Sequence, residues 1–195
     1  MNPKLVILGI QTILKIICEK IIIKNINIIN KSNNFNGKID ELHIRAESII
    51  FNKINISNLD IYIRDIFLRF QFYKKKFLIN NCIADVHMRL SKDNINRTIH
   101  NKKWNRLKTS IESFISMSFQ SIDINKNSIY FINSDGTMKT ETFYTLEYEK
   151  HNISLVNNNN QEKLPILNDK NIIINNLVFS KSYIGIELTS KIMIN

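Results

Sequence analysis

The sequence predicts an α+β fold in which a long, curled antiparallel β-sheet wraps around one long amphipathic helix, with a second amphipathic helix at the N-terminus. Three observations lead to this prediction. Apolar and polar residues alternate over most of the chain, one central stretch has apolar residues every three or four positions, and no internal repeat or linker divides the 195 residues. We therefore expect a single domain over 1–195, long enough to bury a sizeable core.

These patterns divide the chain into four parts. We expect an N-terminal helix over 1–20, strands over 21–90, a helical segment over 93–120 and further strands over 121–195. Isoleucine and asparagine are over-represented, with 39 and 29 copies, so an Asn-rich stretch such as 157–160 counts for little as a sign of disorder. The four glycines and two prolines also favour an ordered chain, because flexible segments are usually rich in both.

The N-terminal helix is predicted from apolar residues whose spacing fits one helical face: Leu5, Leu8, Ile13, Ile16 and Ile17. Polar residues interrupt the run and no small-residue cleavage site follows it, so we expect a retained helix and neither a signal peptide nor a bilayer-spanning helix. Nearby lysines favour a contribution of this helix to membrane association. We expect a cytoplasmic or peripherally membrane-associated protein, and a periplasmic location stays open.

The strands of the first half follow an alternating pattern that changes its parity twice. Apolar residues occupy even positions up to Ile56, odd positions from Leu59 to Ile63, and even positions again from Ile66. Each change requires a bulge or a turn, because a slip of one residue moves every side chain to the other face. We therefore expect long, strongly twisted strands.

The long helix begins where 91–94 offer several capping residues. Apolar residues then recur at intervals of three and four: Trp104, Leu107, Ile111, Phe114, Ile115 and Phe119. Turn and strand signals follow, and they predict strands at 122–132, 140–148 and 152–156, a hairpin turn at 134–136, and a final hairpin of 172–179 and 183–194.

If the sheet curls around the helix, apolar side chains from both share one interior. By periodicity alone, the candidates for a lipid-binding interior are Leu42, Ile44, Ile54, Ile56, Leu59, Ile61, Ile63, Phe114 and Ile115. A concave, Ile-rich face is apolar enough for acyl chains, and burial of a tail contributes roughly 0.8 kcal/mol per methylene. Whether the helix fills this interior or leaves a cavity stays open.

Positive charge is concentrated in the middle of the chain. The net charge is +10, and 64–108 hold twelve Lys and Arg against three Asp. Lysines stand beside aromatic residues here, and the candidate membrane or anion surface comprises Lys74, Lys75, Lys76, Phe72, Tyr73, Lys102 and Lys103. Such a surface attracts anionic phospholipid headgroups or single-stranded nucleic acid, and an ordinary solvated face is the alternative.

No catalytic pattern accompanies these features. The chain has no glycine-rich phosphate loop, no nucleophile elbow and no zinc-binding helix motif, and its four histidines are scattered. Cys18 and Cys82 have neither metal-ligand nor redox spacing, and we expect buried or half-buried free thiols. We therefore expect a protein that is not an enzyme and uses no cofactor and no metal.

Several segments share one pattern of apolar positions: GKIDELHIRA at 37–46, INISNLDIYIRDIFLRF at 54–70, NINRT at 94–98 followed by Trp104 and Leu107, LPI at 164–166, III at 172–174 and IGIEL at 184–188. In the order and spacing of these segments, the chain resembles the bacterial LmeA-like phospholipid-binding family. The resemblance covers nearly the whole chain as a pattern of apolar positions. It implies a tubular lipid-binding fold, phospholipid binding and a role in envelope upkeep without enzymatic activity, and it supplies no diagnostic site residue.

Two functions from different classes follow. The first is a phospholipid-binding or lipid-transfer protein that docks on anionic membranes through its N-terminal helix and basic middle. The second is a nucleic-acid-binding module that uses the basic segment 64–108. An apolar N-terminal helix serves a membrane protein and gives a nucleic-acid binder nothing, so we favour the first. A purely structural assembly factor is a third possibility, and the oligomeric state is not predicted.

Overall fold

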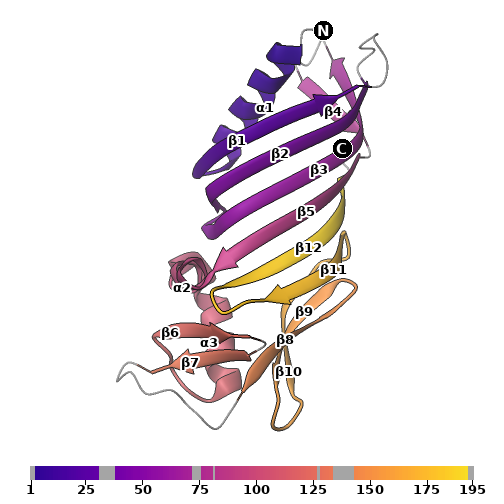
Figure 1. Ribbon diagram of the computed structural model, residues 1–195. Coiled ribbons are helices and arrows are strands. Elements are labelled where there is room, and N and C mark those ends of the chain that lie inside the picture. Colours follow the sequence, from indigo (N-terminus) through magenta and orange to yellow (C-terminus); the bar gives the residue numbers. More distant parts are fainter. Residues whose placement is uncertain are drawn as a thin grey trace.

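A computed structural model describes residues 3–30, 38–71, 76–80, 82–126, 128–133 and 143–192 (Figure 1). The predicted turn at 134–136 and the aromatic and basic residues 72–75 lie outside these ranges. The elements in chain order are α1 (Pro3–Ile17), β1 (Lys20–Ile29), β2 (Lys38–Phe51), β3 (Ile54–Gln71), β4 (Lys76–Asn80), β5 (Cys82–Ser91), α2 (Lys92–Ile99), the 3₁₀ helix η2 (Lys102–Trp104), α3 (Asn105–Ile115), β6 (Ser121–Asn125), β7 (Ser128–Ile132), β8 (Tyr144–Glu149), β9 (Asn152–Asn157), β10 (Lys163–Asn168), β11 (Ile172–Phe179) and β12 (Tyr183–Ile192).

The strands form two antiparallel sheets. The large sheet has the order β1-β2-β3-β5-β12-β11, with β4 paired to β3, and the small sheet has the order β10-β9-β8-β7-β6. Figure 1 shows an elongated molecule with α1 beside the β1 edge at one end, and the small sheet with α2 and α3 at the other. The predicted α+β class with antiparallel sheets is therefore confirmed.

One face of the large sheet is apolar across its width. The registers align Ile26, Ile44, Ile61, Val86 and Leu188 on five neighbouring strands. Side chains directly opposite each other in a ladder point to the same side, so this row and the rows beside it make a continuous apolar surface. We call this surface the inner face.

Two residues with left-handed backbone accompany the changes of parity. Ser48 in β2 and Asp65 in β3 have φ angles of 51° and 55°. At each of these points, the apolar residues of β2 and those of β3 switch between even and odd positions together. Ile49 therefore still pairs with Ile56, and Ile39 with Ile66. A positive φ reverses the side to which the following side chains point, and it lets the apolar residues stay on one face.

The helix that packs on the inner face is α1, not the predicted long helix. Val6 is buried against Leu42 and Ile44, and Ile10 and Leu14 pack against the same cluster. These three residues are spaced four apart and lie on one helical face. The prediction of one long helix wrapped by a curled sheet is therefore not confirmed: α1 packs on the inner face, and α2 meets the large sheet at the ends of β3 and β5.

The predicted helical segment is also broken into three pieces. α2 ends at Ile99, and Asn101 adopts an extended backbone with φ −74° and ψ 135°. The Asn101 side chain accepts a hydrogen bond from the Lys103 amide, so it begins a new helical turn. The spacing of the apolar residues from Trp104 onward predicted α3, but the break before it has no periodic signal.

The strands after α3 differ from the prediction in their grouping. The stretch predicted as one strand is the β6–β7 pair, with a positive φ of 49° at Lys126 in its turn. β10 was missed because it contains Pro165, and a proline is tolerated here because β10 is an edge strand. β11 and β12 return to the large sheet, where β12 pairs with β5. Among the described residues, no helix combines the length and the apolar character needed to cross a bilayer.

Asn96 connects α2 to the edge of the small sheet. Its side-chain Nδ2 donates to the Ile122 carbonyl at 2.9 Å, and its Oδ1 accepts from the Ile122 amide at 2.7 Å. The side chain therefore takes the place of a neighbouring strand for edge strand β6. We expect Asn96→Ala to lower the free energy of unfolding by about 1–3 kcal/mol, because both backbone groups lose their partner.

Urea unfolding followed by circular dichroism measures this loss. Arg97→Ala is the matched control, since Arg97 is the next residue on α2 and is exposed. Equal midpoints for the two variants would contradict a role for Asn96 as the edge partner of β6.

Candidate functional site

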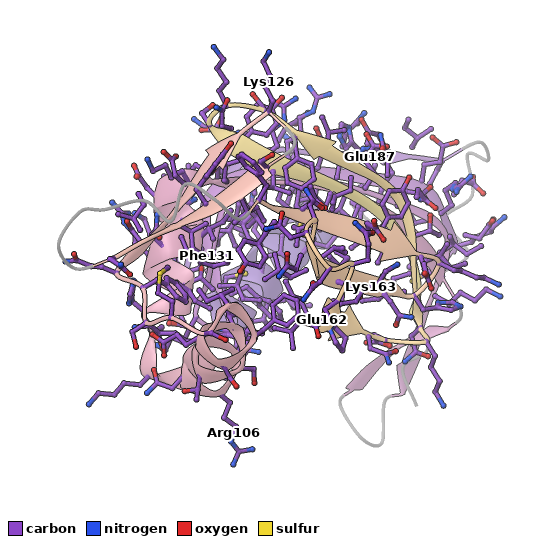
Figure 2. The ribbon with its side chains drawn as sticks, turned by 90° about the horizontal axis from the view of Figure 1, so that it is seen from below. Arg106, Lys126, Phe131, Glu162, Lys163 and Glu187 are labelled. Carbon is purple, nitrogen blue, oxygen red and sulfur yellow. The ribbon has the colours of Figure 1, made fainter. Side chains whose placement is uncertain are left out.

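A cavity of about 190 Å³ lies where the large sheet, α2, α3 and the small sheet meet. We call it the intersheet cavity. Its walls are Ile54, Leu90, Ile184 and Ile186 from the large sheet, Ile95, Thr98 and Ile99 from α2, Leu107 and Ile111 from α3, and Ile122, Ile129, Phe131, Leu146, Ile153, Leu155 and Ile166 from the small sheet. In Figure 2, seen from below, Phe131 lies among the side chains that fill the centre, whereas Arg106 and Lys126 extend outward.

The walls of the intersheet cavity are almost entirely hydrocarbon. Thr98 is the one lining residue with a polar side chain, and its hydroxyl is already engaged. It donates to the Asn94 carbonyl at 2.8 Å and accepts from the Asn55 amide at 2.9 Å. A cavity with no free polar group on its walls favours an apolar occupant over water.

α2 is hydrogen-bonded to both sheets beside this cavity. Ser91 caps the helix by accepting from the Asn94 amide at 3.2 Å. The Ser57 hydroxyl of β3 accepts from the Ser91 amide at 3.1 Å and from the Asn94 side chain at 2.9 Å. With Asn96 bonded to β6, α2 is fixed to both sheets by polar contacts. On the same helix, Ile95 and Ile99 line the cavity.

Aromatic rings form the part of the small sheet beside the cavity. Phe131 packs edge-on against Phe119, with ring centroids 5.0 Å apart, and edge-on against Tyr144 at 5.2 Å. All three rings are buried, and burial raises the pKa of the Tyr144 hydroxyl. Edge-to-face contacts of this kind stabilise the packing of this wall.

The only tryptophan of the chain stands one helical turn before the cavity-lining Leu107. Its indole Nε1 is buried and has no hydrogen-bond partner among the described residues. A buried donor without a partner costs free energy, so a ligand oxygen near this indole would be stabilised. The helical periodicity pointed to Trp104 as an apolar residue, but it contained no signal for the orphaned donor.

The interior residues proposed from the sequence divide into three places. Leu42, Ile44, Ile61 and Ile63 pack beneath α1. Ile54, Ile56 and Leu59 belong to the next cluster, with Cys18 and Ile49, and of the nine only Ile54 lines the intersheet cavity. Phe114 and Ile115 belong to the cluster of the small sheet.

Most cavity residues were missed by sequence reasoning. Leu107 and Ile111 lie on the predicted helix face, but Leu146, Ile166 and Ile186 come from strands whose partners the alternating pattern does not specify. The helical spacing therefore signals one wall of the cavity, and no pattern in the chain signals the others.

The residues of the candidate anion surface do not gather in one place. Lys76 pairs with Gln71 at the far end of β3. The Lys103 ammonium donates to the Asn52 side chain, beside the start of β3. These two ends are roughly 50 Å apart along an 18-residue strand. Lys102 is exposed next to Lys103, and Phe72, Tyr73, Lys74 and Lys75 lie outside the described residues.

Two of the four histidines, which the sequence shows as scattered, come together on the outer, polar face of the large sheet. The His43 ring stacks on Tyr62 at 4.0 Å between centroids, and Tyr62 meets His87 edge-on at 6.2 Å. Asp60 bonds to His43, and Glu187 lies 3.5 Å from His87. Tyr62 and His87 line a hollow of about 500 Å³. No group of His, Cys, Asp or Glu in the described part of the chain is arranged to hold a metal ion.

Both cysteines are free and buried. Cys18 lies directly after α1, and Cys82 begins β5 beneath the same helix. Burial raises the pKa of both thiols, so they remain protonated and poorly nucleophilic at neutral pH. They act as small apolar core residues.

No family model, curated protein or solved structure matches this chain.

Proposed function

We propose that the chain is a non-enzymatic phospholipid-binding or lipid-transfer protein that works at anionic membrane surfaces, in envelope or membrane upkeep. The intersheet cavity carries this proposal, because its walls are apolar and contain no unsatisfied polar group. The resemblance of the sequence to the LmeA-like family supports the same ligand class.

The size and chemistry of the cavity suit the end of an acyl chain. Its 190 Å³ exceeds the roughly 150 Å³ of an engineered apolar cavity that stays dry and binds benzene. Each methylene moved from water into such a space contributes roughly 0.8 kcal/mol. Trp104 stands one helical turn before the cavity-lining Leu107, and its buried indole Nε1 has no partner among the described residues. An ester or phosphate oxygen of the same lipid that reached this indole would satisfy the donor.

Apolar contacts connect the cavity to α1. Ile54 and Leu90 line the cavity and also pack in the cluster of Cys18, the residue that follows α1. Ile56 and Ile49 belong to that cluster too, next to the residues beneath α1. The apolar core is therefore continuous from α1 to the intersheet cavity.

Nucleic-acid binding receives less support. A protein that binds single-stranded nucleic acid needs basic and aromatic side chains along one groove. The basic side chains hold successive phosphates, and the aromatic rings stack on successive nucleobases. Lys76 and Lys103 lie at opposite ends of β3, and the Lys103 ammonium is engaged with Asn52. The lipid proposal does not require these residues to act together.

Mass spectrometry of lipids extracted from the purified full-length chain tests the proposal. We expect a phospholipid near one equivalent per chain. The emission of Trp104 provides a second readout, because it is the only tryptophan and stands one turn from the cavity-lining Leu107. Adding phospholipid vesicles to delipidated protein should shift this emission, and the shift should be absent in Trp104→Phe.

Two results would overturn the proposal. One is protein that carries no lipid and takes none up from vesicles. The other is tight, length-dependent binding of single-stranded RNA without any uptake of lipid, which would establish the alternative function.

A further inference from the structure

α1 has two apolar faces, and only one of them packs against the protein. Val6, Ile10 and Leu14 contact the inner face of the large sheet. On the other side, Leu5, Leu8, Ile13, Ile16 and Ile17 expose between 52% and 76% of their surface. We call these five residues the outward face of α1.

Exposed apolar residues are concentrated at this end of the molecule. Of the thirteen large exposed apolar side chains among the described residues, seven lie between Leu5 and Ile29, including Ile22 and Ile29 on β1. Single exposed apolar residues are ordinary on a protein surface, but a concentration of them marks a contact site. The outward face of α1 therefore requires an occupant.

The charge around this face is positive. Lys4 and Lys15 are about three helical turns apart and flank the apolar residues on one side, because eleven residues return to nearly the same helical angle. Lys20 follows on β1, whereas Lys24 is paired with Glu47 at 2.9 Å. The nearest acid in sequence, Glu19, is bound to Lys53, whose side-chain hydrogen bond lowers the pKa of Glu19. The lysines near α1 thus outnumber the acids.

We infer that the outward face of α1 is the surface by which this protein docks on an anionic bilayer, with the helix lying in the headgroup region. Apolar side chains on a helix flanked by lysines are the pattern of interfacial helices, in which hydrocarbon is buried at the acyl boundary and lysines meet phosphate. This inference rests on the proposed function, since it names the membrane-contacting surface of the lipid carrier.

A second copy of the chain is a poorer occupant. A two-fold dimer sets the same patch against itself, so lysines near α1 would face lysines. Pairing of β1 with another β1 is also hindered. Its register with β2 is irregular between Lys20 and Ile22 and between Ile23 and Asn25, and such bulges with lysine at an edge oppose further strand pairing. A fluid bilayer meets a projecting helix without needing a complementary groove.

Flotation of the full chain with vesicles tests the inference. The probe is a vesicle of phosphatidylcholine with 30% phosphatidylglycerol, compared with phosphatidylcholine alone. Leu8→Gln/Ile16→Gln should reduce the vesicle partition coefficient by about tenfold or more, because hydrocarbon no longer enters the interface. Lys4→Gln/Lys15→Gln should reduce it by roughly fivefold per charge at low salt, and by less at high salt.

Ile83→Gln/Val178→Gln is the matched control, since both residues are about as exposed as the less exposed members of the apolar end but lie on β5 and β11. It should float like the wild type. All variants should keep the wild-type circular dichroism and melting temperature, because none of the changed side chains is buried. A variant that unfolds would show that the outward face is part of the core, and would overturn the inference.

Failure of this inference is distinguishable from failure of the proposed function. Unchanged flotation of the Leu8/Ile16 variant overturns the docking surface, whether or not the protein carries lipid. A wild-type dimer that becomes monomeric in this variant, with no affinity for vesicles, overturns it in favour of a second copy. If the Leu8/Ile16 variant no longer floats with vesicles but still carries co-purified lipid, the result supports the docking surface. Absence of lipid in every variant overturns the proposed function and leaves the flotation result to decide the docking surface.

Discussion

Leu146→Trp is expected to reduce co-purified lipid to the background level, at least about tenfold below the wild type. Leu146 lies on β8 and lines the intersheet cavity from the small sheet. A tryptophan there adds several heavy atoms to a cavity of about 190 Å³, so an acyl chain and the indole compete for one space. The free energy of unfolding should fall by only about 1–3 kcal/mol, the usual cost of placing a larger residue in a packed region.

Ile186→Trp approaches the same cavity from the large sheet and should have the same effect. Ile83→Trp adds an indole on the exposed side of β5 and is the control, expected to retain lipid. Ile44 and Ile61 are unsuitable for this experiment because they pack beneath α1. Lipid extraction with mass spectrometry, and thermal melts before and after delipidation, measure the two effects. If the cavity holds no lipid, both variants should stabilise the protein by filling it and no bound lipid should be lost.

Phe131→Ala is expected to cost about 3–5 kcal/mol of unfolding free energy, the largest single effect on stability that we predict. The Phe131 ring is 4% exposed and contacts the rings of Phe119 and Tyr144. Removing it loses the burial of the ring, both edge-on contacts and the wall of the cavity. The surrounding strands are held in register by their ladder, so the space does not collapse.

Guanidinium unfolding measures this change, and Phe143→Ala is the control. Phe143 is 43% exposed and should change stability by no more than about 1 kcal/mol. Excess phospholipid should restore part of the loss in Phe131→Ala, because the enlarged cavity gains room for the chain and a ligand stabilises the state that binds it. A loss equal in the two variants would show that the aromatic cluster is not the core of this end.

The strands and the first helix were predictable because their signals are local. Alternation at Leu42, Ile44 and Ala46 predicts which side chains share a face, since successive residues of a strand point to opposite sides. The parity changes predict irregularities. The left-handed residue Asp65 stands at the second change, and Ser48 lies on β2 opposite the first. The helical spacing around Leu107 and Ile111 predicts α3 for the same reason.

The break in the predicted long helix was not predictable in this way. It depends on the Asn101 side chain, which accepts from the Lys103 amide and competes with the continuing helix. Asparagine is abundant in this chain, so one more copy carried no weight. The same abundance hid Asn96, whose role depends on the position of β6 and not on its own neighbours.

By itself, the sequence determined the α+β class, the helices α1 and α3, the shared face of Leu42, Ile44 and Ala46 on β2 and the excess of positive charge. Only the tertiary structure decided that the C-terminal strands separate into a small sheet and a return to the large one, that α1 lies on the large sheet, and that a cavity remains between the sheets. The physical reason is that periodicity records which side of an element is apolar. It does not record which apolar surface that side meets, because burial of hydrocarbon is non-directional and any apolar partner satisfies it.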